Sequence, residues 1–399
     1  MSESIVHNVL LGVDIPCVLS MLGMEYERPI KEVSVELYPD MPTTKDVDEH
    51  VTEEGNAKLF KSFKYNYVYD KISGRFARWG STPEEDPAYG PSPEIADIEI
   101  SVDGCPENCA FCYKDNKPTK PTNMKVATFK QILDKMPKAL TQIALGITGM
   151  RTNPDLIPIM EACREKGVVP NFTLTGSDLT KDLATKSAKL AGALAVSVHL
   201  GKKDLCYETV RLYNALGQKQ VNIHLMLAQE TEDFAYDVMD DVKNDKRLKN
   251  LNALVFLGVK PKGRAKGSFH TLSQPGYDKL VDHCLQNEMR FGFDSCSAPK
   301  FESAVTRAKV SNEFKKAMKM RSESCESDLF SCYINVKGEF WHCSFAEEEP
   351  TFGSVNVLEA EDFVRDVWYA KEVMDFRTRS LASMMNGCRR CIAFNEINI

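Results

Sequence analysis

The chain has 399 residues, of which 43% are apolar and 27% charged, an ordinary composition for a globular protein large enough for about two to three domains. Its 57 acidic residues outnumber its 50 basic ones, for a formal net charge of −7, so we expect no bulk DNA binding. No stretch approaches the roughly 20 apolar residues of a membrane span, and the first residues lack the pattern of a signal peptide, so we expect a cytoplasmic protein.

Residues 1–93 show little internal pattern, and we interpret them as an N-terminal extension and linker. They include a polar, acidic stretch from Asp40 to Asn56 and a run rich in proline and glycine from Gly80 to Pro93. Such residues are typical of turns, so the run predicts an exposed linker. The extension is expected to be a cap and tether; the alternative is that it covers the active site or recognises substrate.

Residues 94–290 alternate short β-branched or apolar runs with amphipathic helical patterns, which is typical of βαβ units on a parallel sheet. The predicted strands are Ile95 to Val102, Gln142 to Ile147, Val169 to Thr175, Ala193 to Val198, Val221 to Leu227 and Asn252 to Val259. Helices are predicted near 127–138, 154–166, 178–191, 203–216 and 231–244. The pattern therefore predicts an α/β fold with six strand–helix units, whose active residues gather at the carboxyl ends of the strands.

Three cysteines, Cys105, Cys109 and Cys112, follow the first predicted strand directly. A cubic iron–sulfur cluster with only three thiolate ligands has one iron free to bind a substrate or cofactor, whereas a cluster with four can only transfer electrons or support the fold. The alternatives are a zinc knuckle and three unrelated thiols. Zinc sites usually close at four ligands with a second cysteine pair, and no such pair lies near this motif.

The spacing C-x3-C-x-aromatic-C, with Phe111 at the aromatic position and Tyr113 after the last cysteine, resembles the signature of the radical SAM superfamily. The resemblance implies a partial (β/α)6 barrel and a 4Fe-4S cluster whose open iron binds S-adenosylmethionine (SAM). It also implies an external electron donor, such as flavodoxin or ferredoxin, and release of a 5'-deoxyadenosyl radical that abstracts hydrogen from a substrate. The cofactors supply that chemistry, and the protein positions them.

The same resemblance predicts where SAM binds. The family usually has Gly-Gly-Glu-Pro after the second strand, where this chain has Gly146, Thr148 and Gly149 and no glutamate. Phe111, Tyr113, Thr175, Ser197, Gly263 and Arg264 complete the predicted SAM contacts. The later four could equally be caps or turn residues. His199 and His224, near strand ends, are either substrate donors or structural histidines.

Residues 291–399 lose the alternation and are rich in cysteine, so a second domain is expected there. Cys325, Gly338, Cys343 and the final pair Cys388 and Cys391 resemble the shortened SPASM extension called Twitch. The resemblance implies one auxiliary 4Fe-4S cluster with Cys325, Cys343, Cys388 and Cys391 as ligands. Zinc is the alternative metal.

The other cysteines have different predicted roles. Cys332 is left over by this pattern; it could replace a ligand, lie buried or act near substrate. Cys163, Cys206 and Cys284 lie in helical patterns and are expected to be packing residues.

The segment that joins the two regions contains Asp294 and Cys296, which we interpret as candidate catalytic residues. Asp294 could bind or deprotonate substrate, and Cys296 could return a hydrogen atom to a substrate radical or ligate a cluster. The alternative is a plain turn, which Asp, Ser and Pro favour.

The leading functional hypothesis is a radical SAM enzyme that acts on a peptide or an amino-acid-like substrate. The chain also resembles uncharacterised radical SAM proteins of bacteriophages, so the first alternative is hypermodification of a nucleobase or of an amino acid attached to one, with a nucleotide substrate. The second is a non-catalytic iron–sulfur protein that transfers electrons, which would have no need for an unligated iron.

Overall fold

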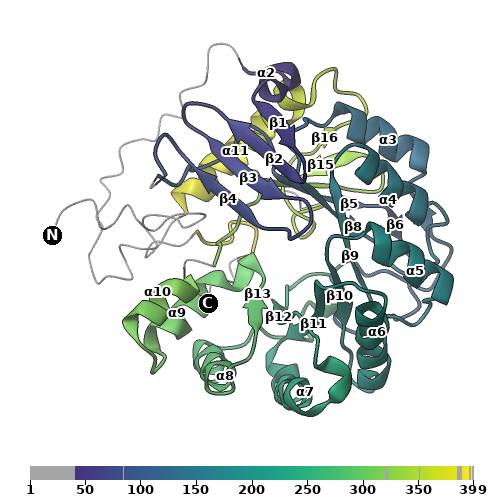
Figure 1. Ribbon diagram of the computed structural model, residues 1–399, viewed down its shortest axis with the longest axis vertical. Coiled ribbons are helices and arrows are strands. Elements are labelled where there is room, and N and C mark those ends of the chain that lie inside the picture. Colours follow the sequence, from purple (N-terminus) through teal and green to yellow (C-terminus); the bar gives the residue numbers. More distant parts are fainter. Residues whose placement is uncertain are drawn as a thin grey trace.

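The computed structural model describes residues 41–83, 85–319, 322–349, 351–383, 389–394 and 397. Its main feature is a curved ten-stranded sheet (Figure 1). The strand order is β13 (Phe291–Phe293), β12 (Ala253–Gly258), β11 (Val221–Leu227), β10 (Leu194–Ser197), β9 (Val169–Leu174), β8 (Gln142–Gly146), β5 (Ile95–Glu99), β14 (Ser331–Ile334), β15 (Glu339–Trp341), β16 (Val355–Asn356). Strands β13 to β14 in this order are parallel, and β15 and β16 are antiparallel.

Helices cover the outer face of the parallel strands (Figure 1). They are α3 (Val126–Lys135), α4 (Leu156–Glu165), α5 (Lys181–Leu190), α6 (Lys203–Ala215), α7 (Glu232–Asn244) and α8 (Gln274–Gln286). Each has an apolar stripe that it buries on the sheet; α4, for example, buries Leu156, Ile159 and Met160. The predicted α/β class, the six strands and the five helices are confirmed. Helix α8 completes the sixth unit, and its start is fixed by the Ser273 side chain, which accepts a hydrogen bond from the Gly276 N–H.

The sheet continues beyond these six units on both sides. Strand β13 pairs in parallel with β12, and η5 (Ser295–Ser297), α9 (Ala298–Arg307) and α10 (Asn312–Lys319) follow it. On the other side, β14 pairs in parallel with β5, so residues 331–356 of the cysteine-rich region extend the barrel sheet. The π-helix η6 (Val364–Trp368) and α11 (Lys371–Ala382) then cover this edge and bury Trp368 and Arg377.

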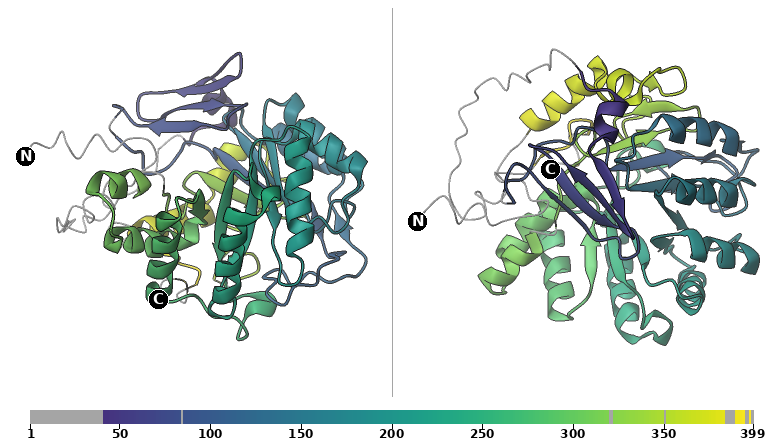
Figure 2. Two further views of the ribbon diagram at one scale, coloured as in Figure 1. Left: turned by 60° about the horizontal axis from the view of Figure 1, so that its bottom comes forward. Right: turned by 45° about the horizontal axis from the view of Figure 1, so that its top comes forward.

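The described part of the N-terminal region is an ordered sheet, which the sequence analysis missed. After α2 (Thr44–Asp48), strands β1 (Val51–Glu54), β2 (Ala57–Lys61), β3 (Asn66–Asp70) and β4 (Phe76–Trp79) form an antiparallel meander. In the left view of Figure 2 this meander lies across the top of the barrel. Its contacts are to the segments that precede the barrel strands: the Lys58 ammonium donates to the Leu140 carbonyl (2.7 Å) and the Tyr67 hydroxyl to the Ala139 carbonyl (2.6 Å). The meander therefore closes the amino-terminal end of the barrel.

The expected exposed linker before β5 is wrong in its second half. Gly90 and Ser92 are buried. The Gly90 N–H donates to the Leu329 carbonyl (2.8 Å), and the Trp368 indole donates to the Gly90 carbonyl (3.1 Å). These contacts fasten the segment to the C-terminal region.

The remaining short elements lie at turns: β6 (Ser101–Val102) pairs with β7 (Thr122–Asn123), and η2 (Gln229–Thr231), η3 (Lys246–Leu248) and η4 (Gly263–Ala265) are single 3-10 turns. No helix in the described ranges has both the length and the apolar character needed to cross a membrane.

Candidate active site

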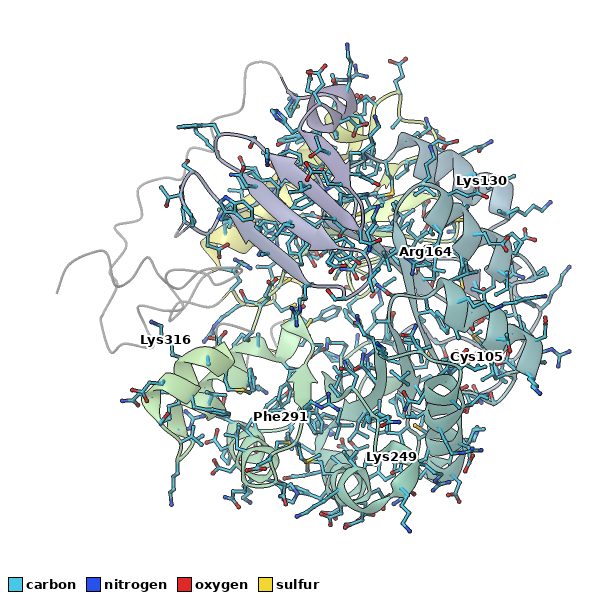
Figure 3. The ribbon with its side chains drawn as sticks, viewed as in Figure 1. Cys105, Lys130, Arg164, Lys249, Phe291 and Lys316 are labelled. Atoms are coloured by element: carbon cyan, nitrogen blue, oxygen red, sulfur yellow. The ribbon has the colours of Figure 1, made fainter. Side chains whose placement is uncertain are left out.

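The three cysteines of the first motif lie on one loop at the carboxyl end of β5, and Cys105 is labelled in Figure 3. The Cys112 N–H donates to the Cys109 carbonyl (3.2 Å), and the Cys105 N–H to the Lys117 carbonyl (3.2 Å). All three cysteines are half-buried and unpaired. Burial, together with the nearby Cys105 and Cys112, raises the pKa of the Cys109 thiol to about 12. The thiols thus lie close enough to repel one another when ionised. Metal binding requires the deprotonated thiols, and the positive charge of bound iron would offset their repulsion.

Gly263 and Arg264, two of the predicted SAM contacts, lie against this loop. The Arg264 N–H donates to the Cys112 carbonyl (3.0 Å), and its guanidinium donates to the Cys109 carbonyl (2.8 Å) and to Asp115 (2.7 Å). Gly263 has a φ of +57°, and a Cβ there would lie 2.4 Å from the Cys112 oxygen. Only glycine fits so close to the loop backbone. The pair therefore fixes the shape of the cysteine loop, and direct contact with SAM stays a prediction.

The aromatic position of the motif packs on a histidine. The Phe111 ring stacks on His199 with 5.5 Å between centroids, and His199 Nδ1 is 3.5 Å from Cys109 Sγ. Burial lowers the pKa of His199, so a neutral imidazole is favoured beside the thiol. His199 thus belongs to the loop's surroundings.

Thr175 and Ser197, at the ends of β9 and β10, are at the same end of the barrel. The Thr175 hydroxyl donates to Glu107 (3.0 Å), the middle residue of the first cysteine spacing. The Lys202 ammonium binds the same carboxylate (2.6 Å). Ser197 lies level with His224 of β11, whose pKa burial lowers to about 4. Thr175 thus contacts the cysteine loop, and Ser197 lies at the end of β10.

The segment after β8, which replaces Gly-Gly-Glu-Pro, also packs on the loop. The Thr148 hydroxyl donates to the Asp103 carbonyl (2.7 Å). A Cβ at Gly149 would lie 2.6 Å from Asp178 Oδ2, and one at Gly146 would lie 3.0 Å from the Glu99 Cα. The two glycines therefore permit close packing around the site.

The cysteines of the C-terminal region line a cavity of about 250 Å³ between β5, β14 and the end of β13. Cys325, Cys343 and Cys391 face it, as does Cys296; Cys388 lies outside the described residues. Burial raises the pKa of the Cys343 thiol to about 12, and the nearby Cys325 is the second cause of this shift. Within the described ranges no three His, Cys, Asp or Glu side chains are grouped closely enough for a single metal ion. A cubane does not need that convergence, because its thiolates bind separate irons.

Cys332 is 2% exposed and packs in the hydrophobic core, although it also borders this cavity. The charged groups near its thiol are Asp97 and Asp328. Cys163, Cys206 and Cys284 are buried in the same core, as predicted.

The two cysteine sites are joined by contacts that sequence reasoning missed. The Tyr113 ring lies 4.5 Å from that of Phe345, and the Lys262 ammonium donates to the Phe345 carbonyl (3.0 Å). Lys114, the residue after Tyr113, binds Glu99 (3.0 Å) and also contacts Glu347. In the sequence, the only sign of these contacts was the position of Lys114 next to the first cysteine motif.

Of the two carboxylates Asp97 and Asp294, Asp97 lines the cavity, whereas Asp294 directly follows β13. Asp294 binds the Lys260 ammonium (2.6 Å), whose side chain is only 3% exposed. Asp97, on β5, was missed. Its carboxylate faces the cavity, and no hydrogen bond or ion pair joins it to any described residue. It is accessible from the cavity but surrounded by protein, and this loss of solvation raises its pKa to about 6.

No protein-family model matches the sequence, and no curated protein matches it significantly. The structure is similar to solved structures. Streptococcus suis SuiB bound to S-adenosylmethionine superposes with a TM-score of 0.62 at 11% identity, over 86% of this chain and 99% of SuiB. SuiB bound to its precursor peptide SuiA gives 0.61 over the same shares, again at 11% identity. Native anSMEcpe with bound AdoMet and the Cp18Cys peptide gives 0.50 at 14% identity, over 71% of this chain and 82% of that one. The chain therefore shares the fold of these structures, and the predicted α/β barrel is confirmed.

Proposed function

We propose that the chain is a radical SAM enzyme that reductively cleaves SAM and uses the 5'-deoxyadenosyl radical to abstract hydrogen from a peptide or an amino-acid-like substrate. The observation that carries this proposal is the loop with Cys105, Cys109 and Cys112 at the carboxyl end of β5, in a fold shared with SAM-bound structures. Three thiols and no fourth cysteine in the loop suit a cluster with one open iron.

The residues around the loop fit such a cluster. When bound, a 4Fe-4S cluster with an open iron supplies the electron that breaks the SAM sulfonium bond. Arg264 and Gly263 hold the loop backbone, and Phe111 and His199 cover Cys109. We assign the SAM pocket to the surfaces formed by Gly146, Thr148, Gly149, Thr175, Ser197 and Tyr113. An external flavodoxin or ferredoxin in the cytoplasm would deliver the electron.

We further propose that the cavity between β14 and β13 holds one auxiliary 4Fe-4S cluster. The supporting observation is that Cys325, Cys343 and Cys391 all line this cavity. The Twitch pattern of the sequence predicts Cys388 as the fourth ligand. The contact between Tyr113 and Phe345 brings the two sites together. The auxiliary cluster would accept an electron from the substrate after hydrogen abstraction.

A peptide is the substrate class that the comparisons favour. SuiB has been solved with the peptide SuiA, and anSMEcpe with the peptide Cp18Cys. The substrate would lie over the carboxyl ends of the strands, where Asp294 with its partner Lys260 contributes one polar wall. We assign to Asp294 the role of binding the substrate backbone or receiving its proton.

The test is anaerobic reconstitution, which should give about eight irons per chain for two 4Fe-4S clusters. Reduction in the presence of SAM should release 5'-deoxyadenosine, detected by mass spectrometry. Cys109→Ala should abolish this release, and Cys284→Ala, which changes a core cysteine, should not. Deuterium transfer from labelled peptides rather than from labelled nucleotides into 5'-deoxyadenosine would identify the substrate class. Absence of 5'-deoxyadenosine from iron-loaded wild-type protein would refute the proposal.

A further inference from the structure

The described cysteines divide into three environments. Cys163, Cys206, Cys284 and Cys332 are part of the hydrophobic core. Cys105, Cys109 and Cys112 share the loop after β5. The remaining four, Cys296, Cys325, Cys343 and Cys391, all line the cavity between β13 and β14. One site therefore has three thiols and the other has four, the numbers that an open and a closed cubane require.

Cys296 differs from the packing cysteines in its surroundings. It lies on η5, directly after β13. It is absent from the hydrophobic core that contains Cys163, Cys206, Cys284 and Cys332. The groups that act on its thiol are Lys260, Asp294, Cys325 and Cys343. An apolar packing role does not explain a thiol placed among a cation and two further thiols.

The η5 turn is held firmly in position. The Ser297 N–H donates to the Asp294 carbonyl (2.9 Å), and the Tyr277 hydroxyl bonds to Ser297 Oγ (3.0 Å). The Asp294 N–H donates to the Phe256 carbonyl of β12 (3.1 Å). A ligand on such a turn is positioned by the barrel itself, and preorganised ligands of this kind favour metal binding.

Lys260 provides the charge that a thiolate cluster needs nearby. Its ammonium is bound to Asp294 (2.6 Å) and lies 5.0 Å from the Phe345 ring centroid, between η5 and the loop that carries Cys343. A cluster with four thiolate ligands has a net negative charge, and a buried cation beside it offsets that charge and tunes its potential.

We propose that Cys296 is the fourth ligand of the auxiliary cluster, together with Cys325, Cys343 and Cys391, so that Cys388 is not required. This rests on the auxiliary cluster of the proposed function. The cluster would then bridge the barrel at β13 and the C-terminal region. This assignment replaces the catalytic hydrogen-donor role that the sequence suggested for Cys296, since a thiolate bound to iron has no hydrogen atom to return.

The test uses the full chain with Cys105, Cys109 and Cys112 all changed to Ala, so that only the auxiliary site can bind iron. After anaerobic reconstitution this parent should hold about four irons per chain and show the Mössbauer spectrum of a 4Fe-4S cluster. Adding Cys296→Ala should remove most of that iron or convert the cluster to a three-iron form. Adding Cys388→Ala or Cys332→Ala should change neither iron content nor spectrum, with circular dichroism confirming the fold of each variant.

The outcomes separate the two proposals. A parent without iron would refute the auxiliary cluster itself. An iron-loaded parent whose iron and spectrum survive Cys296→Ala would refute only the ligand assignment. Loss of iron with Cys388→Ala would also refute it, because the fourth position would then belong to Cys388.

Discussion

The two ends of the barrel differ in the partners that their polar side chains have. At the amino end, the β1–β4 meander places Lys58 and Tyr67 on the carbonyls of residues 138–140, so these two buried polar groups are paired. At the carboxyl end, the three cysteines of the loop form no disulfide, and the Asp97 carboxylate faces a cavity without a partner. Paired groups stabilise a fold, whereas unpaired ones cost stability and are available to ligands. The amino end of the barrel therefore serves mainly stability, and the carboxyl end mainly chemistry.

The largest expected effect follows from removing one thiol at the carboxyl end of the barrel. Cys109→Ala should lower 5'-deoxyadenosine release by more than the roughly 10- to 100-fold loss that follows disturbance of an outer-shell partner, because a direct ligand is removed. The urea midpoint of unfolding of the metal-free protein should stay within experimental error of wild type. A variant that still cleaved SAM would show that these thiols do not hold the reactive cluster.

A glycine substitution should test whether loop shape matters as much as the thiols. Gly263→Ala places a Cβ 2.4 Å from the Cys112 oxygen, so the loop must move, and we expect about 10-fold weaker retention of iron at the first site. Gly267→Ala is the matched control: its φ is also positive, at +74°, but nothing lies within 4 Å of the added Cβ. Equal iron loss in both variants would mean that backbone strain, not contact with the loop, is responsible.

Substitutions at the amino end of the barrel should change the free energy of unfolding and leave SAM cleavage unchanged. Lys58→Met removes the donor to the Lys138 (3.0 Å) and Leu140 (2.7 Å) carbonyls, and leaving buried acceptors unpaired should cost about 2 kcal/mol of unfolding free energy, measured by urea denaturation. Lys71→Met, which removes a more exposed partner of Glu53, should cost less than about 0.5 kcal/mol. SAM cleavage per folded molecule should be unchanged in both. A loss of cleavage in a folded Lys58→Met protein would contradict the division between the ends.

Sequence reasoning succeeded where the determinants are local. Each barrel strand is a short apolar run next to an amphipathic helix, and the three cysteines of the first motif lie within eight residues of one another. Such patterns are visible without knowledge of the tertiary structure.

Sequence reasoning failed where distant contacts decide the structure. Strand β2 has lysine at a fully buried position, because Lys58 is satisfied by carbonyls about 80 residues away. The polar residue hid the alternating pattern of the strand. Asp97 was missed because β5 was interpreted as a structural strand; side chains alternate along it, so that Ile95 and Asp97 both face the cavity, and the sequence does not reveal this cavity.

Asp97 lowers the stability of the folded chain at neutral pH, so removing its carboxylate should increase stability. Its pKa is about 6 in the folded chain, above the ordinary 3.8, so the folded state binds its proton more tightly than the unfolded state. The resulting contribution to stability is fully present below pH 3.8 and is lost as the pH rises through 6. At neutral pH the wild-type protein therefore holds an ionised carboxylate that the surrounding protein disfavours, although the residue is open to the cavity.

Asp97→Asn should consequently raise the urea midpoint at pH 8, and the gain over wild type should shrink steadily as the pH is lowered from 6 toward 4, because both side chains are then neutral. Asp237→Asn, at an exposed position of α7, is the control and should show little change at any pH. A gain that did not depend on pH would mean that ionisation of Asp97 is not its source. If the stabilised Asp97→Asn protein still released 5'-deoxyadenosine but made less product from a labelled peptide, the unpaired carboxylate would belong to substrate binding, and its cost in stability would be explained by function.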